Sequence, residues 1–214
     1  MQKSNFQNKM ETSKLGKKRI GILGGSFDPI HNGHLHMAVC AKEEYALDEV
    51  WLIPAGHSPN KDETKMTSAE HRYAMTCLAV QNCEGLQVSS IEMESEQRSY
   101  TWRTLEKLHT RYPDIHFYFI MGADSLDYFD KWAHPERICQ YADLLVIHRD
   151  DFAIDEKMEM VRKQFHANVS AVSCEKYPIS STQLREMIKN DGDCARFLPE
   201  NVLRYIAEQE LYKR

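Results

Sequence analysis

A glycine pair between an apolar run and a helical pattern constrains this chain more than any other feature. The apolar run Ile20–Leu23 is followed directly by Gly24 and Gly25, and an amphipathic stretch continues from Leu35. That order predicts a strand, a tight loop and a helix. Because glycine has no Cβ, we expect Gly24 and Gly25 to let the backbone turn sharply and approach a ligand closely.

The start of this helix is predicted to bind an anion. Asn32 is a good N-cap residue, which would place His34 in the first helical turn. The free N–H groups and the positive end of the helix dipole at such a terminus favour an anion. His31 and His34 lie on one side of that turn and can both donate hydrogen bonds to phosphate oxygens. The segment is therefore predicted to hold a nucleotide phosphate.

Two other interpretations of the segment are open. An ordinary strand–helix turn with surface histidines would also contain a glycine pair, although the full string from Gly24 to His34 is far more specific. His31, His34 and His36 crowd together as in a metal site. However, no Cys, Asp or Glu completes a familiar zinc spacing nearby, and His36 falls on a different face from His34. We therefore expect no metal held by these histidines.

Length and composition exclude several classes of function. A chain of 214 residues suits one domain with a sizeable core. The formal net charge of −5, with no basic run to offset it, argues against nucleic-acid binding. An anionic substrate must then be bound by a few local groups. No stretch approaches membrane-spanning length.

The cysteines and the N-terminus indicate a cytoplasmic protein. The six cysteines form no Cys-x-x-Cys pair and are scattered singly, so we expect core thiols in a reducing compartment. Residues 1–16 are polar and lack the apolar segment of a secretory signal. We expect them to be a mobile N-terminal extension before a domain of residues 17–214. The oligomeric state is left open, a homo-oligomer included.

Short apolar strands alternate with helical patterns along the chain. The predicted strands are Arg19–Leu23, Val50–Ile53, Leu86–Ser90, Phe117–Met121, Leu144–Ile147 and Val169–Val172. The predicted helices are Asn32–Tyr45, Ser68–Gln81, Thr101–Tyr112, Asp155–Phe165 and, closing the chain, Ser181–Asn190 and Glu200–Glu208. Continuous apolar runs are typical of strands covered on both faces. The order predicts a single α/β domain with a Rossmann-like, doubly wound parallel sheet and helices on both faces.

Ligands of such sheets bind beyond the carboxyl ends of the strands, near the switch in strand order. Four segments directly follow predicted strands, namely residues 24–34, 54–61, 122–125 and 148–149. We expect all four to border one cleft. Neither Gly-x-Gly-x-x-Gly nor a P-loop motif is present, which disfavours a nicotinamide-dependent dehydrogenase and a P-loop ATPase.

A second anion site is predicted at Ile179–Arg185. A serine N-cap starts a helix there, and Arg185 lies one turn further on, facing the same way. Its guanidinium can form two parallel hydrogen bonds to phosphate oxygens. A capped surface helix with a solvated arginine is the alternative interpretation.

These motifs together resemble the nucleotidyltransferase superfamily with the His-x-Gly-His and Ile-Ser-x-Thr-x-x-Arg signatures. Within it, the chain from about residue 18 to 212 resembles the bacterial nicotinate-nucleotide adenylyltransferases. The closer resemblance is carried by Gly-Ala-Asp-Ser at residues 122–125 with Trp132, Ser-Tyr-Thr-x-x-Thr-Leu at 99–105, and Leu-Pro-x-x-Val at 198–202. Related pantetheine-phosphate and glycerol-phosphate transferases share the first motif but not this later set.

The resemblance implies transfer of the adenylyl group of ATP to nicotinate mononucleotide, in NAD biosynthesis. It implies catalytic roles for His31, His34 and Arg185. The implied ATP-binding residues are Gly24, Gly25, Ser26, Phe27, His31, His34, Gly122, Asp124, Arg149, Ile179, Ser180, Ser181 and Arg185. The implied nicotinate mononucleotide-binding residues are Ser26, Lys61, Tyr100, Thr101, Asp124 and Trp132. Mg²⁺ would be carried on ATP, because the sequence offers no carboxylate cluster for a metal cage.

Two departures from the family pattern put the acceptor side in doubt. Where the family usually has Pro-Pro-His-Lys, this chain has Ser-Pro-Asn-Lys at residues 58–61, and His57 is a candidate substitute for the missing histidine. Trp102 replaces a smaller aliphatic residue and could reshape the nicotinate pocket. The remaining alternatives are a non-catalytic nucleotide-binding protein of the same fold, a cytidylyltransferase and a pantetheine-phosphate adenylyltransferase.

Overall fold

The computed structural model describes residues 16–58, 64, 66–148, 153–175 and 177–213. Its centre is a six-stranded sheet of β1 (Lys18–Gly25), β2 (Glu49–Pro54), β3 (Leu86–Val88), β4 (Ile115–Gly122), β5 (Asp143–His148) and β6 (Val169–Ser173). The strand order is β3-β2-β1-β4-β5-β6, and every neighbouring pair is parallel. The chain reverses its direction of travel across the sheet between β1 and β4, which confirms the predicted doubly wound topology.

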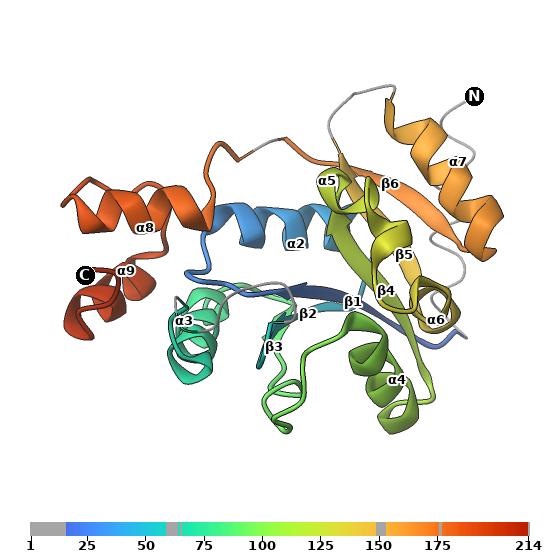
Figure 1. The fold of residues 1–214 in the computed structure, drawn as a ribbon, viewed down its shortest axis with the longest axis horizontal. Coiled ribbons are helices and arrows are strands. Elements are labelled where there is room, and N and C mark those ends of the chain that lie inside the picture. The colour runs from blue at the N-terminus through green and yellow to red at the C-terminus, as the bar shows by residue number, and fades with distance from the viewer. Residues whose placement is uncertain (1–15, 59–63, 65, 149–152, 176, 214) are drawn as a thin grey trace.

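Helices connect the strands and close the chain. They are α2 (Asn32–Glu44), α3 (Ala69–Val80), α4 (Thr101–Arg111), α5 (Ala123–Leu126), α6 (Pro135–Tyr141), α7 (Ala153–Phe165), α8 (Ser181–Lys189) and α9 (Glu200–Glu208). Figure 1 shows α8 and α9 together at one end of the molecule and α6 and α7 at the other. No helix of the described residues is long and apolar enough to cross a membrane.

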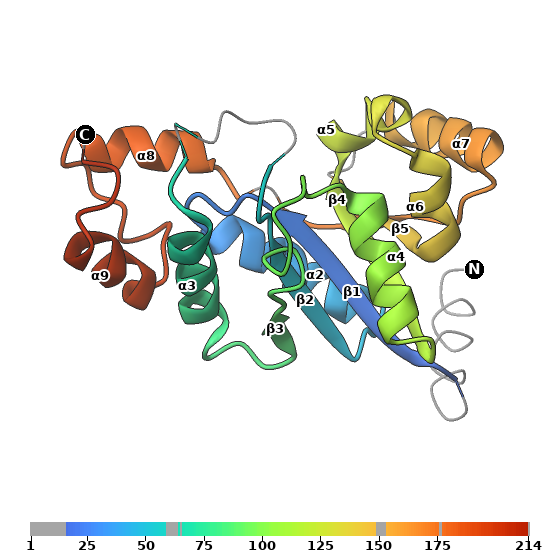
Figure 2. The ribbon, with the colours of Figure 1, turned by 60° about the horizontal axis from the view of Figure 1, so that its bottom comes forward.

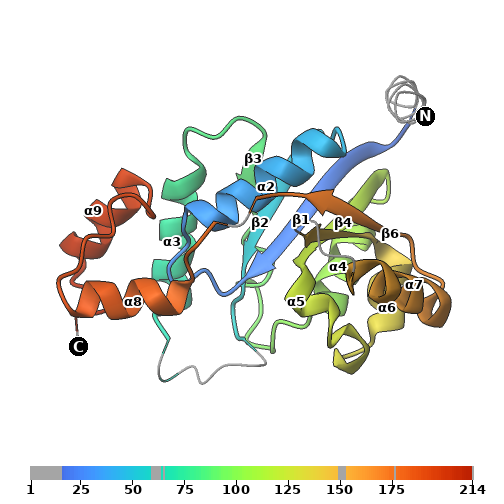
Figure 3. The same ribbon diagram turned by 90° about the horizontal axis from the view of Figure 1, so that it is seen from above.

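Alternation along the strands divides the apolar side chains between two cores. In β4, Phe117, Phe119 and Met121 enter the core that contains α4, α6 and α7, whereas Ile120 enters the core of α2, α3, α8 and α9. Successive strand residues point to opposite faces, so an unbroken apolar run serves both cores. Figure 2 shows α4 on the near side of the strands, and Figure 3 shows α2 crossing the other face. Both faces of the sheet are therefore covered, as predicted.

The structure corrects the sequence prediction at two places. β1 continues through Gly24 and Gly25, so the glycines extend the strand and do not form the tight turn. The seven-residue helix α6 was not predicted, because Pro135 opens it and few of its side chains are buried. The proposed extension, residues 1–16, lies outside the described residues except for Gly16.

Candidate active site

The segment after β1 needs glycine because two rings pack against the backbone. A Cβ on Gly25 would lie 2.8 Å from the Phe27 ring, and one on Gly33 would lie 3.0 Å from the His31 ring. Real Cβ contacts are essentially never as short as 2.8 Å, and 3.0 Å is tighter than most, so a larger residue at either position would force the ring to shift. Phe27 is buried and has a φ of 47°, in the left-handed region. The glycine of the His-x-Gly-His motif is thus needed for the packing of the His31 ring, in addition to any role of the motif in binding a ligand.

The N-cap of α2 is His31, one residue before the predicted Asn32. Its backbone N–H donates to Nδ1 of His34 across 3.3 Å, and the two rings stack with their centroids 3.7 Å apart. Nδ1 of His34 is therefore the acceptor, which leaves the ring proton on Nε2. Burial lowers the pKa of His31 from 6.5 to about 4, so this ring is neutral at pH 7. The pair then offers N–H donors without two adjacent positive charges.

The second predicted anion site lies directly against this loop. Ser180 caps α8 as predicted, and its side chain accepts a hydrogen bond from the backbone N–H of Gln183. Ser181 Oγ donates to the Pro29 carbonyl across 3.0 Å, and Arg185 Nη1 donates to the Asp28 carbonyl across 2.7 Å. Residues separated by more than 150 positions in the chain thus form one structure. The solvated-arginine interpretation is wrong, since Arg185 binds the loop backbone.

Two residues to which the sequence analysis assigned no role also hold the loop. Arg72 is 2 % exposed, and its guanidinium donates to the carbonyls of Ser26, Gly56 and Thr67 at 2.8, 3.1 and 2.9 Å. Tyr212 donates its hydroxyl to Oδ1 of the buried Asp28 across 2.7 Å. Burial and the adjacent Asp28 carboxylate raise the pKa of Tyr212. Arg72 had a signal in the sequence: it is a charged residue on the buried stripe of α3. Tyr212 had none.

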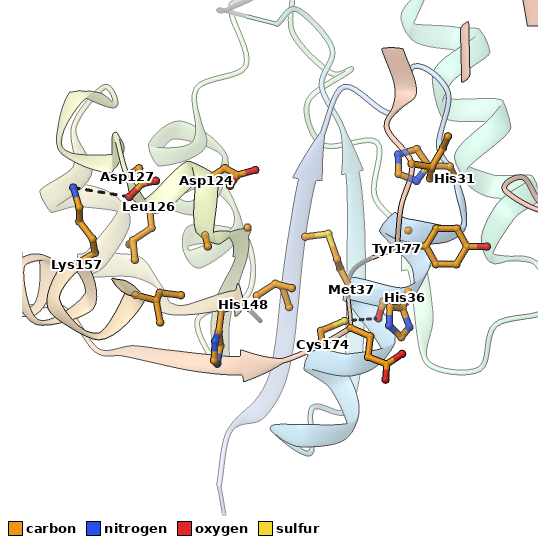
Figure 4. Close-up of a pocket in the computed structure, with 17 residues that line it drawn as sticks. His31, His36, Met37, Asp124, Leu126, Asp127, His148, Lys157, Cys174 and Tyr177 are labelled. Carbon is orange, nitrogen blue, oxygen red and sulfur yellow. Dashed lines mark hydrogen bonds and ion pairs between the residues drawn. The ribbon is translucent and has the colours of Figure 1, made fainter. Parts of the chain in front are cut away.

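A cavity of about 490 Å³ opens beside the loop, at the switch point of the sheet. Its lining includes His31 and Gly33 from the loop, Gly122 and Asp124 around the end of β4, His148 at the end of β5, and Ile179 before α8. Figure 4 shows His31 and Tyr177 on one side of the cavity and Asp124, Asp127 and Lys157 on the other. Its size falls within the range of small-molecule sites, about 300–1,000 Å³. Three of the four segments expected at one cleft meet here.

The fourth segment, after β2, faces a different neighbour. The backbone N–H of Ser99 donates to the His57 carbonyl across 2.8 Å. The backbone N–H of His57 donates in turn to Ser99 Oγ across 3.2 Å. Tyr100 follows as the N-cap of α4. The start of α4 leaves the N–H groups of Thr101 and Trp102 without intrahelical acceptors. This end of α4 can therefore receive an anionic group.

Known proteins resemble this one along most or nearly all of the chain. A family described as Cytidylyltransferase-like matches residues 22–187. A relative from Clostridium botulinum (strain Alaska E43 / Type E3), named "Probable nicotinate-nucleotide adenylyltransferase", is 38% identical over 199 residues, 92% of this chain and 98% of the relative. One of the same name from Clostridium novyi (strain NT) is 34% identical, over 92% of this chain and 100% of the relative. The chain belongs to the nicotinate-nucleotide adenylyltransferase family.

Solved structures show the same fold. The Plasmodium falciparum nicotinic acid mononucleotide adenylyltransferase complexed with NaAD matches with a TM-score of 0.75 and 24% identity, over 91% of this chain and 97% of that one. The same enzyme complexed with APC matches with a TM-score of 0.73 and 23% identity, over 91% and 97%. At this identity the likeness establishes the fold alone.

Trp102 and Trp132, the two tryptophans considered in the sequence analysis of the acceptor pocket, both pack against other aromatic rings. Trp102, the departure from the usual adenylyltransferase pattern, packs edge-on against the His134 ring at 5.0 Å and under the Arg137 guanidinium at 4.3 Å. Trp132 contacts the rings of Phe119 and Phe129 at 6.0 and 5.6 Å. Its Nε1 is buried and has no hydrogen-bond partner among the described residues.

The adenylyltransferase residues implied by the resemblance are thus only partly brought together. Of the implied residues that the structure describes, His31, Gly122, Asp124 and Ile179 line the cavity beside the loop. The others do not line it: Gly24, Gly25, Ser26, Phe27, His34, Tyr100, Thr101, Trp132, Ser180, Ser181 and Arg185. Lys61 and Arg149 lie outside the described residues. The sequence analysis also missed Glu92, whose carboxylate accepts a 2.6 Å hydrogen bond from Thr104 on α4. Burial raises the pKa of Glu92, against the opposing effect of its hydrogen bonds.

Proposed function

We propose that this protein transfers the adenylyl group of ATP to nicotinate mononucleotide, forming nicotinate adenine dinucleotide and pyrophosphate in NAD biosynthesis. The observation that carries the proposal is the junction of α8 with the β1–α2 loop beside a nucleotide-sized cavity. There the starts of two helices, two stacked histidines and one arginine are held together around the β1–α2 loop, and helix starts favour anions. Family membership supports the same reaction.

The loop side would bind ATP. Backbone N–H groups of residues 24–27 would approach the phosphates, as would the N–H groups at the start of α8 near Ser180 and Ser181. The Nε2–H group of His34 would donate a hydrogen bond to an oxygen of the α-phosphate, where negative charge grows during the reaction. Two Arg185 nitrogens bind the Asp28 carbonyl and Thr182 Oγ1 across 2.7 and 3.3 Å, and its remaining N–H groups would reach the polyphosphate.

The α4 side would bind the acceptor. The N–H groups of Thr101 and Trp102 would hold the pyridine carboxylate, since a helix start favours an anion. Trp132 would stack on the pyridine ring, and Asp124 would accept hydrogen bonds from ribose hydroxyls. Ser26 and Lys61 would contact the acceptor's phosphate.

The chemistry needs little activation by the protein. The 5′-phosphate of the acceptor is already an anion at neutral pH, so one of its oxygens would attack the α-phosphorus in line. The new P–O bond forms as the bond to the β-phosphate oxygen breaks, and pyrophosphate leaves with the electron pair. The contribution of His31, His34 and Arg185 is to position the groups and stabilise the charge. No step requires a covalent enzyme intermediate.

Magnesium would arrive with ATP. The groups that meet at the loop are imidazoles and a guanidinium, and the described residues contain no cluster of three carboxylates that could cage an ion. Phosphate oxygens and water would therefore hold Mg²⁺, which suits its preference for oxygen ligands and retained waters. When bound, the ion would neutralise part of the charge on the triphosphate.

The cytoplasmic location expected from the sequence stays a prediction.

Pyrophosphate release tests the reaction directly. The purified protein is incubated with Mg-ATP or Mg-CTP and, in turn, nicotinate mononucleotide, nicotinamide mononucleotide or phosphopantetheine. We expect rapid release with ATP and nicotinate mononucleotide, and the adenine dinucleotide as product. Turnover with CTP or phosphopantetheine at an equal rate would assign the chain to another branch of the superfamily. Tight ATP binding without turnover of any acceptor would instead support a non-catalytic binding protein.

A further inference from the structure

Three soft ligand groups converge next to the cavity, apart from the residues proposed to bind either substrate. His36 and Cys40 lie one turn apart on α2, and Cys174 follows the end of β6. One ligand atom from each lies within 4.8 Å of the other two, the only such group in the part of the chain that the structure describes. Cys40 Sγ lies 3.7 Å from Nε2 of His36. The sequence analysis expected no metal at His36, because Cys174, the third member of this cluster, is 134 positions away from Cys40 in the chain.

Hydrogen bonds between α2 and β6 fix this convergence. Tyr45 at the end of α2 donates its hydroxyl to the Ala171 carbonyl across 2.9 Å. Ser173 donates its backbone N–H to the Glu44 carboxylate across 2.8 Å. Cys174 itself donates its backbone N–H to the His148 carbonyl across 3.3 Å. The three ligand groups thus lie on elements that are pinned to one another.

The separation of Cys40 and His36 matches a tetrahedral metal centre, and Cys174 lies within 4.8 Å of both ligand atoms. Zinc–sulfur bonds of about 2.3 Å and zinc–nitrogen bonds of about 2.0–2.1 Å place two thiolate sulfurs about 3.8 Å apart and sulfur and nitrogen about 3.6 Å apart. The observed separation of Cys40 Sγ and His36 Nε2 is 3.7 Å. Cys40 Sγ is also 3.8 Å from Nδ1 of His36, so the imidazole must rotate to aim one nitrogen at the ion. Such a rotation is open to a half-buried side chain on a helix surface.

We propose that His36, Cys40 and Cys174 form a binding site for a Zn²⁺-class transition-metal ion whose fourth coordination position faces the cavity. His36 and Cys174 line that cavity, and Figure 4 shows them on the same wall. Three protein ligands and one open position are the arrangement of accessible zinc sites. Thiolate and imidazole ligands select soft and borderline ions and reject Mg²⁺ and Ca²⁺. The site is therefore distinct from the Mg²⁺ that would arrive with ATP.

The other cysteines show what a merely structural thiol looks like in this protein. Cys83 and Cys194 each donate to a nearby carbonyl, those of Ala79 and Gly192, at 3.6 Å. Cys174 also donates to a carbonyl, that of His36 at 4.0 Å, but Cys40 lies against the His36 imidazole, and only these two thiols share a ligand group among the described residues. Cys83 provides the matched control, since it is also half-buried and near a helix end.

Cobalt titration of the reduced, metal-free full chain tests the site without measuring enzyme activity. We expect one equivalent of Co²⁺ to produce a thiolate-to-metal charge-transfer band and the visible bands of tetrahedral cobalt. One equivalent of Zn²⁺ should remove both, whereas millimolar Mg²⁺ should not. Cys40→Ser, Cys174→Ser and His36→Gln should each weaken Co²⁺ binding at least about tenfold, the smallest loss seen even for outer-shell partners. Cys83→Ser should leave the titration unchanged.

Circular dichroism of each metal-free variant checks that it folds. Because Cys174 is buried, Cys174→Ser carries the greater risk of misfolding, and the half-buried Cys40 and His36 provide independent variants. Absence of a cysteine-dependent band in the native protein would overturn the proposal. So would titrations of folded Cys40→Ser and His36→Gln that match Cys83→Ser.

Discussion

The two sides of the proposed active site are held by different kinds of contact. On the ATP side, Arg72, Arg185 and Tyr212 reach the β1–α2 loop from three other parts of the chain, each through a hydrogen bond of 2.7–2.8 Å. On the acceptor side, Trp102 and Trp132 are placed mainly by contacts between rings. Hydrogen bonds fix direction, whereas ring packing fixes position and shape.

This difference suits the two tasks. Charge that develops on a transferring phosphoryl group is stabilised only by donors already aimed at it, so the ATP side needs a rigid polar frame. The acceptor is chosen by the fit of a flat ring and one carboxylate, for which shape and a few donors suffice. Substitutions on the ATP side should therefore lower kcat or stability, and the acceptor side should decide selectivity. The predictions below test that division, beginning with the largest effect.

The largest effect is expected from His34→Ala. Loss of the Nε2 donor should lower kcat by about 10²- to 10³-fold, as removal of one transition-state donor does elsewhere, while ATP binding weakens less. Steady-state kinetics and ATP titration would measure both. His109→Ala, on the exposed face of α4, is the control and should behave as wild type. A kcat within a few-fold of wild type would remove His34 from the mechanism.

Acceptor selectivity should be the next largest effect. Nicotinamide mononucleotide would place an NH₂ group against a donor at the start of α4, at a cost of about 1–3 kcal/mol per unsatisfied group, more where charge is lost. We expect kcat/KM to favour the acid by at least about 10²-fold. Equal kcat/KM values for acid and amide would show that the pocket is wrongly assigned.

The buried His31 should make stability fall in acid. Burial lowers its pKa from 6.5 to about 4, so below pH 6.5 the unfolded chain takes up a proton that the folded protein resists. The contribution is fully present above pH 6.5 and is lost as the pH falls toward 4. The free energy of unfolding should drop by about 2–3 kcal/mol over that range from this group. Denaturant titrations of His31→Asn should show a correspondingly shallower decline, and parallel curves would contradict the assignment.

The smallest effect is expected from Arg185→Lys. Lysine keeps the charge but loses the planar fork that binds Asp28 and a phosphate together, so KM for ATP should rise about tenfold with a smaller change in kcat. Arg204→Lys is the matched control, because Arg204 pairs with Glu200 on the exposed side of α9. If KM for ATP does not change, Arg185 serves only the docking of α8.

The local patterns were sufficient for the architecture and for much of the loop. The boundaries of α9 and the capping of α8 by Ser180 agree with the structure, because apolar spacing and a serine cap act within one turn. The N-cap of α2 was misplaced by one residue, since Asn32 has the better capping side chain but His31 has the extended backbone. The preference of asparagine for the N-cap position was thus outweighed at this helix start by the packing of the His31 ring against Gly33.

What the sequence by itself determined is therefore whatever depends on neighbouring residues: the alternation of strands and helices, the glycines before His34, and the two anion motifs. Only the tertiary structure decided that Arg72 and Tyr212 hold the loop, that Trp102 turns toward α6, and that Cys174 meets His36 and Cys40. These contacts join residues from separate elements, so no local period or spacing encodes them. They exist because a parallel sheet brings the carboxyl ends of distant strands to one edge, where the chain's polar groups must find partners in each other.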